Sequence, residues 1–177
     1  QRFEFNSLIE TPEIYTWTIK KDYFHFDMRY FNGYDFLTFL QIAGKSRLDS
    51  VCSILIDFIL KNLDSSIMIK FPQEVFKEKT LETLQILSLR KDIDHQKLSA
   101  YFDYLLSFSS EVLFPAGYCH GDLTLSNLLV YKFEDKLMAI DFLDSFLDSP
   151  IQDYVKLRQD TQFFWSLLLY TGNIDVT

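Results

Sequence analysis

Two runs of β-branched and aromatic residues lie near the start of the chain, separated by a short polar segment. Residues 14–19 and 23–28 have the composition typical of strands, and the polar residues between them predict a turn. Gly33 is expected to end this extended part. Residues 35–40 then begin a short helical pattern, which Gly44 closes. The pattern predicts that strands come first and that helices follow.

The middle of the chain has the periodicity of amphipathic helices. Residues 46–63 place apolar side chains at the i, i+3 and i+4 positions of one helix face. Residues 73–90 and 94–108 repeat this spacing. In the first of these two segments, Val75 and Leu81 are expected to face inward. We expect the three helices to pack as one helical layer.

The pattern becomes extended again in the last third of the chain. Residues 112–118 predict an extended segment, and two short apolar runs, 128–131 and 136–140, flank a polar turn. This arrangement favours a small β-hairpin. Beyond it, residues 151–170 predict one helix, with Gly172 as its stop.

Composition and charge narrow the class of protein. The chain has 177 residues, of which 48% are hydrophobic and 24% charged, as expected for one soluble globular domain. Seventeen Lys and Arg against 25 Asp and Glu give a net charge of −8, which disfavours binding to nucleic acid or anionic lipid. No apolar stretch is long enough for a membrane span and no signal peptide is readable, so we expect a cytoplasmic protein.

The cysteine count excludes two kinds of structural site. Cys52 and Cys119 are the only cysteines, too few for a disulfide scaffold or a four-cysteine zinc site. We expect both to be reduced thiols.

The candidate chemistry lies in residues 118–127, with the sequence YCHGDLTLSN, and in Asp141, fourteen residues after Asn127. The pattern is H-x-D-x-x-x-x-N, a hairpin, and then I-D-F. Phosphoryl transfer to a hydroxyl needs a carboxylate that orients the acceptor and takes its proton, and oxygen ligands for Mg²⁺. Asp122, Asn127 and Asp141 supply this set, and the hairpin is expected to fold Asp141 back beside the other two.

With these motifs the sequence resembles the kinase-like phosphotransferases, specifically the aminoglycoside phosphotransferase and choline kinase branch, over about residues 26–160. The resemblance implies an α+β fold, namely a mainly helical protein-kinase-like C-lobe with a small catalytic β-hairpin, preceded by the last antiparallel strands of an N-lobe. Residues 1–32 would be the remnant of the N-lobe and the hinge. Residues 33–177 would be the C-lobe.

The resemblance also implies roles for individual residues. Asp122 matches the catalytic aspartate. His120 matches the residue that braces the loop of this aspartate, and we count it among the catalytic residues. Asn127 and Asp141 match the two metal ligands. Asp153 matches an aspartate at the start of the following helix that binds the backbone of the catalytic loop. The implied cofactors are ATP and Mg²⁺.

The nucleotide is expected to bind at residues 28–33, which resemble the hinge between the two lobes. Met28 would lie behind the adenine. The carbonyl of Arg29 and the amide of Phe31 would be its hydrogen-bond partners.

Departures from the protein-kinase pattern indicate a small-molecule acceptor. Gly121 and Thr124 stand where serine/threonine protein kinases carry Arg and Lys, and Leu143 replaces the glycine of the DFG motif. Only eight residues separate Asp141 from Pro150, too few for an activation segment that docks a peptide. An amino sugar, choline or ethanolamine, and a glycan intermediate all remain open, and the segment after Asp141 is similar to bacterial phosphotransferases of capsule and surface-glycan synthesis.

Other interpretations compete with this one. No glycine precedes Gly33, so no glycine-rich phosphate loop is readable, and we expect the chain to be part of a longer enzyme. The alternative is a non-catalytic, kinase-like interaction module. A metal-dependent hydrolase that uses His120, Asp122 and Asp141 is a third hypothesis. The cluster Lys156-Leu157-Arg158 is interpreted as a charged helix face, and the oligomeric state is left open.

Overall fold

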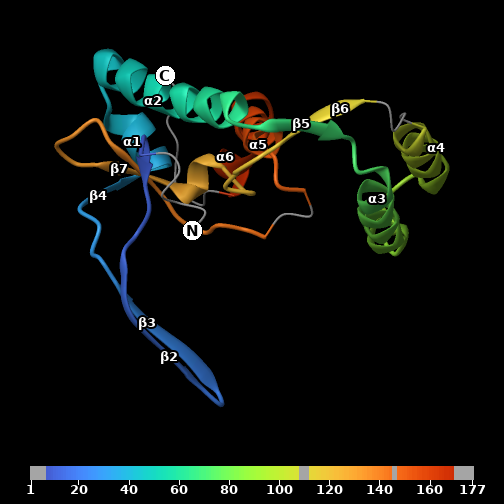
Figure 1. Ribbon diagram of the computed structural model, residues 1–177, viewed down its shortest axis with the longest axis horizontal. Helices are drawn as coiled ribbons and strands as arrows, with labels where there is room; N and C mark the ends of the chain where they lie inside the picture. The colour runs from blue at the N-terminus through green and yellow to red at the C-terminus, as the bar shows by residue number, and fades with distance from the viewer. Residues whose placement is uncertain (1–6, 108–111, 145–146, 170–177) are drawn as a thin grey trace.

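The computed structural model describes residues 7–107, 112–144 and 147–169, and it is a mixed α+β structure (Figure 1). Within these ranges, the chain forms helices and three small sheets. None of the described helices has the length and apolar character that a membrane span requires.

The largest sheet has four short strands that come from three distant parts of the chain. The strands are β1 (Ile9–Glu10), β4 (Gly33–Asp35), β7 (Leu128–Tyr131) and β8 (Leu137–Ala139), in the spatial order β1-β8-β7-β4. β7 and β8 pair antiparallel, which confirms the predicted hairpin, whereas β1 runs parallel to β8. β4 pairs antiparallel with β7.

The expectation that Gly33 ends the extended part is wrong, because Gly33 begins β4. A glycine suits this position for a steric reason. A Cβ atom at Gly33 would collide with the carbonyl oxygen of Val130 on the neighbouring strand. The close approach of the two backbones is what places β4 beside β7.

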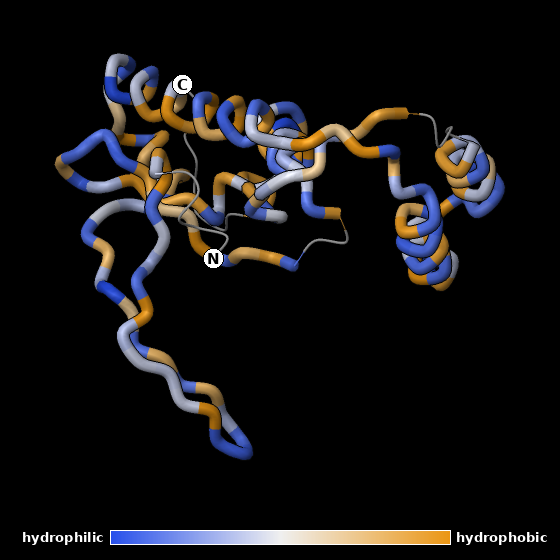
Figure 2. Tube along the Cα trace, in the orientation of Figure 1, coloured by the Kyte–Doolittle hydropathy of each residue, from blue (hydrophilic) through white to orange (hydrophobic). Residues whose placement is uncertain are grey.

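The first predicted hairpin is confirmed as β2 (Ile14–Lys20) and β3 (Tyr23–Met28), which pair antiparallel. It projects away from the rest of the structure (Figure 1), and every residue in both strands is exposed. In Figure 2 the projecting hairpin carries hydrophobic as well as hydrophilic residues, of which Trp17 is 64% exposed.

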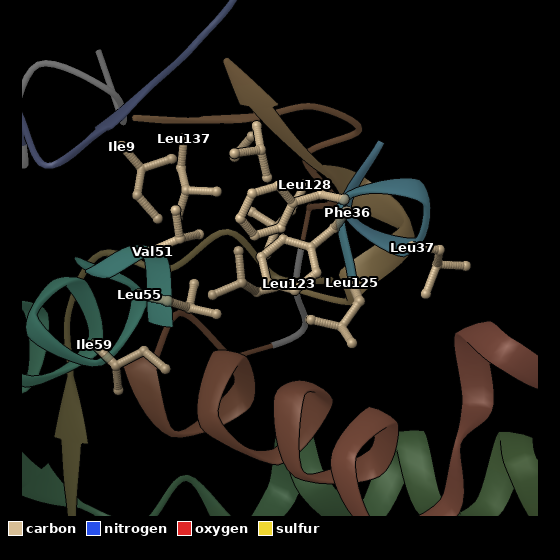
Figure 3. Packing of buried hydrophobic residues seen from close by; sticks show 13 residues of the cluster. Ile9, Phe36, Leu37, Val51, Leu55, Ile59, Leu123, Leu125, Leu128 and Leu137 are labelled. Carbon is tan, nitrogen blue, oxygen red and sulfur yellow. The ribbon is translucent and has the colours of Figure 1, made fainter. Parts of the chain in front are cut away.

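The hydrophobic core lies between the four-stranded sheet and the first two helices. These are α1 (Phe36–Ile42), capped by the Asp35 side chain, and α2 (Lys45–Asp64). The predicted helix over 46–63 is confirmed as α2, and it buries Val51, Leu55 and Ile59 at helical spacing. Figure 3 shows Leu123 and Leu125, from the segment after Asp122, in the same cluster. The candidate catalytic segment is therefore anchored by side chains that are themselves part of the hydrophobic core.

The prediction of one layer formed by three helices is wrong. α3 (Gln73–Ser88) and α4 (His95–Leu106) pack against each other, whereas α2 packs against α5 (Pro150–Phe163). The reason is a strand that the sequence analysis missed. β5 (Ile67–Lys70) pairs with β6 (Leu113–Ala116), and this ribbon carries the α3–α4 pair away from α2 (Figure 1).

This arrangement leaves much of α3 outside the core. Val75 and Leu81, both expected to face inward, are 40% and 47% exposed. The predicted end of α4 at residue 108 lies outside the described residues.

The last predicted helix is two helices, α5 and α6 (Trp165–Leu169), so the prediction of one helix over 151–170 is wrong. Phe164 adopts a left-handed conformation with φ of 54° and ends α5. The buried carboxylate of Asp160 then accepts a hydrogen bond from Ser166 N at 2.6 Å, in the first turn of α6. Residue 170 and Gly172, the expected stop, lie outside the described residues.

Candidate active site

The backbone of the loop that contains the H-x-D motif is hydrogen-bonded to a buried carboxylate of α5. Asp153 is fully buried, and its two oxygens accept hydrogen bonds from His120 N at 2.8 Å and from Gly121 N at 3.0 Å. These contacts confirm that Asp153 binds the backbone of the loop. Buried amide groups must be paired to avoid a desolvation cost, so one side chain sets the path of two residues.

A second buried carboxylate fixes the other end of the loop, and the sequence analysis missed it. Asp160 accepts a hydrogen bond from Leu125 N at 2.6 Å, in addition to its bond from Ser166 N. It lies seven residues after Asp153 and therefore on the same face of α5. Two acidic residues at this spacing within one predicted helix were the available signal.

His120 is buried, and both of its ring nitrogens have backbone partners. Nε2 lies 2.8 Å from the carbonyl oxygen of Ile140, and Nδ1 accepts a hydrogen bond from Asp122 N at 3.2 Å. These partners require the tautomer with its proton on Nε2. Burial lowers the pKa of His120, which keeps the ring neutral. Its ring also packs against Phe142, with centroids 4.1 Å apart, so His120 joins the loop to the strand end that carries Asp141.

Gly121 adopts a conformation that few other residues accept. Its φ is +88°, and a Cβ atom there would lie 2.5 Å from the carbonyl oxygen of Leu143. A side chain at position 121 would therefore push the loop of the H-x-D motif away from the segment after Asp141.

The carboxylate of Asp122 contacts two other side chains, those of Asn127 and Lys156. The Asn127 side-chain amide donates to the Asp122 carbonyl at 2.9 Å and to its Oδ2 at 3.1 Å. Lys156 Nζ lies 2.8 Å from Oδ1, and the Asp122 side chain remains 25% exposed. Each of the two carboxylate oxygens thus contacts a different side chain, while the carboxylate remains partly exposed to solvent.

The interpretation of residues 156–158 as a charged helix face is wrong for Lys156. Its ammonium group pairs with Asp122, whereas Arg158 Nε donates to Gln162 on the same helix at 2.9 Å. Sequence alone gave no sign of the difference, because both residues lie on α5 with the same charge.

The β7–β8 hairpin brings Asp141 toward Asn127, as expected. The Ile140 amide donates to the Asn127 carbonyl at 3.0 Å, which extends the pairing of the hairpin to the residue before Asp141. Asp141 is exposed and adopts a left-handed conformation with φ of 62°. Within the described residues, no group of three or more His, Cys, Asp or Glu side chains is arranged to hold a metal ion. The amide of Asn127 and the carboxylate of Asp141 are nonetheless hard oxygen donors of the kind that Mg²⁺ takes, one or two at a time, from proteins.

The expected hinge lies at the other end of β7 from the catalytic loop. The ring of Phe31 packs edge-on against Tyr131, with centroids 4.7 Å apart, and the Arg29 guanidinium donates to the Tyr131 hydroxyl at 2.8 Å and to Glu10 at 2.5 Å. Met28 ends β3 and is 48% exposed. One strand thus separates the Tyr131 contacts of Arg29 and Phe31 from Asn127, a span of about 13 Å at the usual rise per residue.

The buried Asp153 predicts a pH dependence of stability. Burial raises the pKa of Asp153 from 3.8 to about 6, against the lowering effect of its two backbone hydrogen bonds. The folded state therefore binds this proton more tightly than the unfolded state. The stabilisation is complete below pH 4 and is lost as the pH rises through 6. We expect the unfolding free energy of the wild type, relative to Asp153→Asn, to rise by about 2–3 kcal/mol between pH 7 and 4.

Urea denaturation of both proteins at pH 7, 6, 5 and 4 measures this difference, because the other titrating groups cancel between them. A difference that stays constant over this range, or that moves in favour of the variant as the pH falls, would contradict the assignment.

Comparison with known proteins identifies the family. Among curated proteins, no sequence matches the chain significantly. The sequence model of the phosphotransferase enzyme family matches residues 71–169, which include the loop of the H-x-D motif, the β7–β8 hairpin and α5. The match spans more than half of the 177 residues and supports the resemblance to aminoglycoside phosphotransferases. The chain therefore belongs to the phosphotransferase enzyme family.

Proposed function

We propose that this protein transfers the γ-phosphoryl group of ATP, with Mg²⁺, to a hydroxyl of a small molecule. The observation that carries the proposal is the setting of Asp122. Its loop is fixed by Asp153, its carboxylate is held by Asn127 and Lys156, and it remains open to solvent. A carboxylate in this setting is suited to orient an acceptor hydroxyl.

In the proposed reaction Asp122 acts on the acceptor. Its carboxylate accepts a hydrogen bond from the hydroxyl and takes its proton as the oxygen attacks phosphorus in line. The bond between the hydroxyl oxygen and phosphorus forms, and the bond from phosphorus to the bridging oxygen of ATP breaks. ADP leaves with that electron pair.

Asn127 and Asp141 would hold Mg²⁺. The side-chain nitrogen of Asn127 donates to Asp122, which directs the amide oxygen to other partners, and Asp141 is an exposed carboxylate at the end of the hairpin. When bound, the ion neutralises the charge of the phosphate groups.

His120 is proposed to position the loop. Its Nε2 proton is directed to the Ile140 carbonyl and its Nδ1 accepts from the Asp122 amide. Both contacts stabilise the backbone of the residue that carries the reacting carboxylate.

Met28, Arg29 and Phe31 are proposed to contact the adenine. The contacts of Arg29 and Phe31 with Tyr131, at one end of β7, support this, because the length of one strand suits the span from a base to its terminal phosphate. The division into an N-lobe remnant and hinge, residues 1–32, and a kinase-like C-lobe, residues 33–177, belongs to the same proposal. The mixed α+β fold is compatible with it.

The acceptor is proposed to be an amino sugar, choline or ethanolamine, or a surface-glycan precursor. The short connection between Asp141 and Pro150 supports a small molecule. The test incubates the protein with ATP, Mg²⁺ and each acceptor class, and follows phosphomonoester formation by phosphorus NMR. We expect one class to yield a product that requires Mg²⁺. Release of inorganic phosphate from a simple phosphoester without ATP would instead favour a hydrolase.

A further inference from the structure

We propose that Lys156 is a further catalytic residue of this site, whose ammonium group binds the phosphoryl group during its transfer. The inference rests on the proposed phosphotransferase function. It starts from one contact that the sequence did not reveal, the pair between Lys156 Nζ and Asp122 Oδ1 at 2.8 Å.

The position of Lys156 is fixed by the same helix that holds the catalytic loop. Lys156 lies three residues after Asp153, which binds the loop backbone, and four residues before Asp160, which binds Leu125 N. Residues at these spacings lie on one side of a helix. The stem of Lys156 therefore starts from a point that two buried carboxylates hold in register with Asp122.

The catalytic loop itself has no cation. Residues 118–127 contain neither Lys nor Arg, and Gly121 and Thr124 occupy the positions where protein kinases carry them. The charge of the transferring phosphoryl group is spread over its three outer oxygens and needs positive groups around it. α5 supplies one at the place where the loop does not.

The distances favour this role over a purely structural ion pair. The acceptor oxygen must come within about 2.6–3.2 Å of Asp122, with phosphorus about 3–3.5 Å beyond it. An ammonium group already in contact with Asp122 reaches an oxygen of that phosphoryl group by rotation of its own flexible stem. The Lys156 side chain is 37% exposed, so its ammonium group is not enclosed in the core.

The chemistry leaves Lys156 unchanged. The hydroxyl proton passes to Asp122, the new oxygen–phosphorus bond forms, and the bridging bond breaks with its electrons on ADP. Lys156 keeps its protons throughout and contributes only its charge, which is most useful when the phosphoryl group is between its two partners.

The test compares three variants. Lys156→Met keeps most of the stem and removes the charge, Lys156→Arg restores it, and Arg158→Met removes a cation two residues away that binds Gln162 instead. Two readouts are measured on each: Mg²⁺-dependent ATP turnover, with water as acceptor, and calorimetric binding of ADP with and without aluminium fluoride, which imitates the transferring group. Circular dichroism checks that each variant is folded.

We expect Lys156→Met to lower kcat by about 10²-fold, with KM for ATP within about threefold, as for other groups that stabilise developing charge. It should remove most of the tightening of ADP binding by aluminium fluoride. Lys156→Arg should recover at least about tenfold of the lost kcat, and Arg158→Met should stay within about twofold of wild type.

Lys156→Met with wild-type kcat and full tightening would overturn the inference, and so would an equal loss of affinity for ADP with and without aluminium fluoride. If the proposed function itself is wrong, the result differs. In that case the wild type shows neither Mg²⁺-dependent turnover nor tighter ADP binding with aluminium fluoride.

Discussion

Asp122→Ala is expected to reduce phosphoryl transfer by about 10²–10⁴-fold, the range that a positioned general base contributes. The variant removes the group that is proposed to orient the acceptor and take its proton, whereas ATP contacts other residues in the proposed site. We therefore expect the affinity for ATP to change by less than about threefold. Turnover and ATP affinity of the variant and the wild type, measured side by side, check this prediction.

Two further variants serve as controls for Asp122. Asp122→Asn keeps the shape of the side chain without its charge and should be as inactive as Asp122→Ala. Asp135→Asn removes a carboxylate from the turn of the same hairpin, where it pairs with Arg47, and should leave turnover unchanged. Turnover of Asp122→Ala within a few-fold of wild type would show that another group is the base.

Asp153→Ala is expected to lower the free energy of unfolding by about 2–5 kcal/mol at pH 7, and activity with it. The substitution leaves the buried amides of His120 and Gly121 without a partner, and each unpaired buried donor costs about 1–3 kcal/mol. Relief of the buried charge offsets part of this cost. Urea denaturation measures the change, and turnover below the unfolding midpoint measures the loss of loop order.

The matched control for Asp153 is Asp57→Ala, at an exposed position of α2, which should stay within about 0.5 kcal/mol of wild type. If Asp153→Ala unfolds at the same urea concentration as Asp57→Ala, the carboxylate does not hold the catalytic loop.

The predicted elements that the structure confirms share one property: their signal is local. Apolar residues along one face indicate α2, and the β2–β3 and β7–β8 hairpins join neighbouring segments across polar turns. β1 and β4 are only two and three residues long, and each pairs with a strand more than ninety residues further along the chain. Nothing in so short a stretch indicates its partner.

The residues of the candidate site also fall into those with a local sequence signal and those without one. Asp122, Asn127 and Asp141 belong to a motif of fixed spacing on one loop and one hairpin, so the sequence predicted that they come together. Lys156 and Asp160 reach the loop from α5, 34 and 35 residues after their partners, and only the packing of that helix brings them there. The break at Phe164 was missed because no glycine or proline marks it.

The central claim, that this site holds ATP with Mg²⁺, is tested most directly by calorimetric titration of the chain with ATP, with and without Mg²⁺. Asp141→Ala is the variant of the proposed metal ligand, and Asp135→Asn is its control. We expect binding that weakens by about tenfold or more, about 1.4 kcal/mol, when either Mg²⁺ or the Asp141 carboxylate is removed. Binding that is indifferent to both, or no binding at all, would contradict the account and favour a kinase-like module without catalysis.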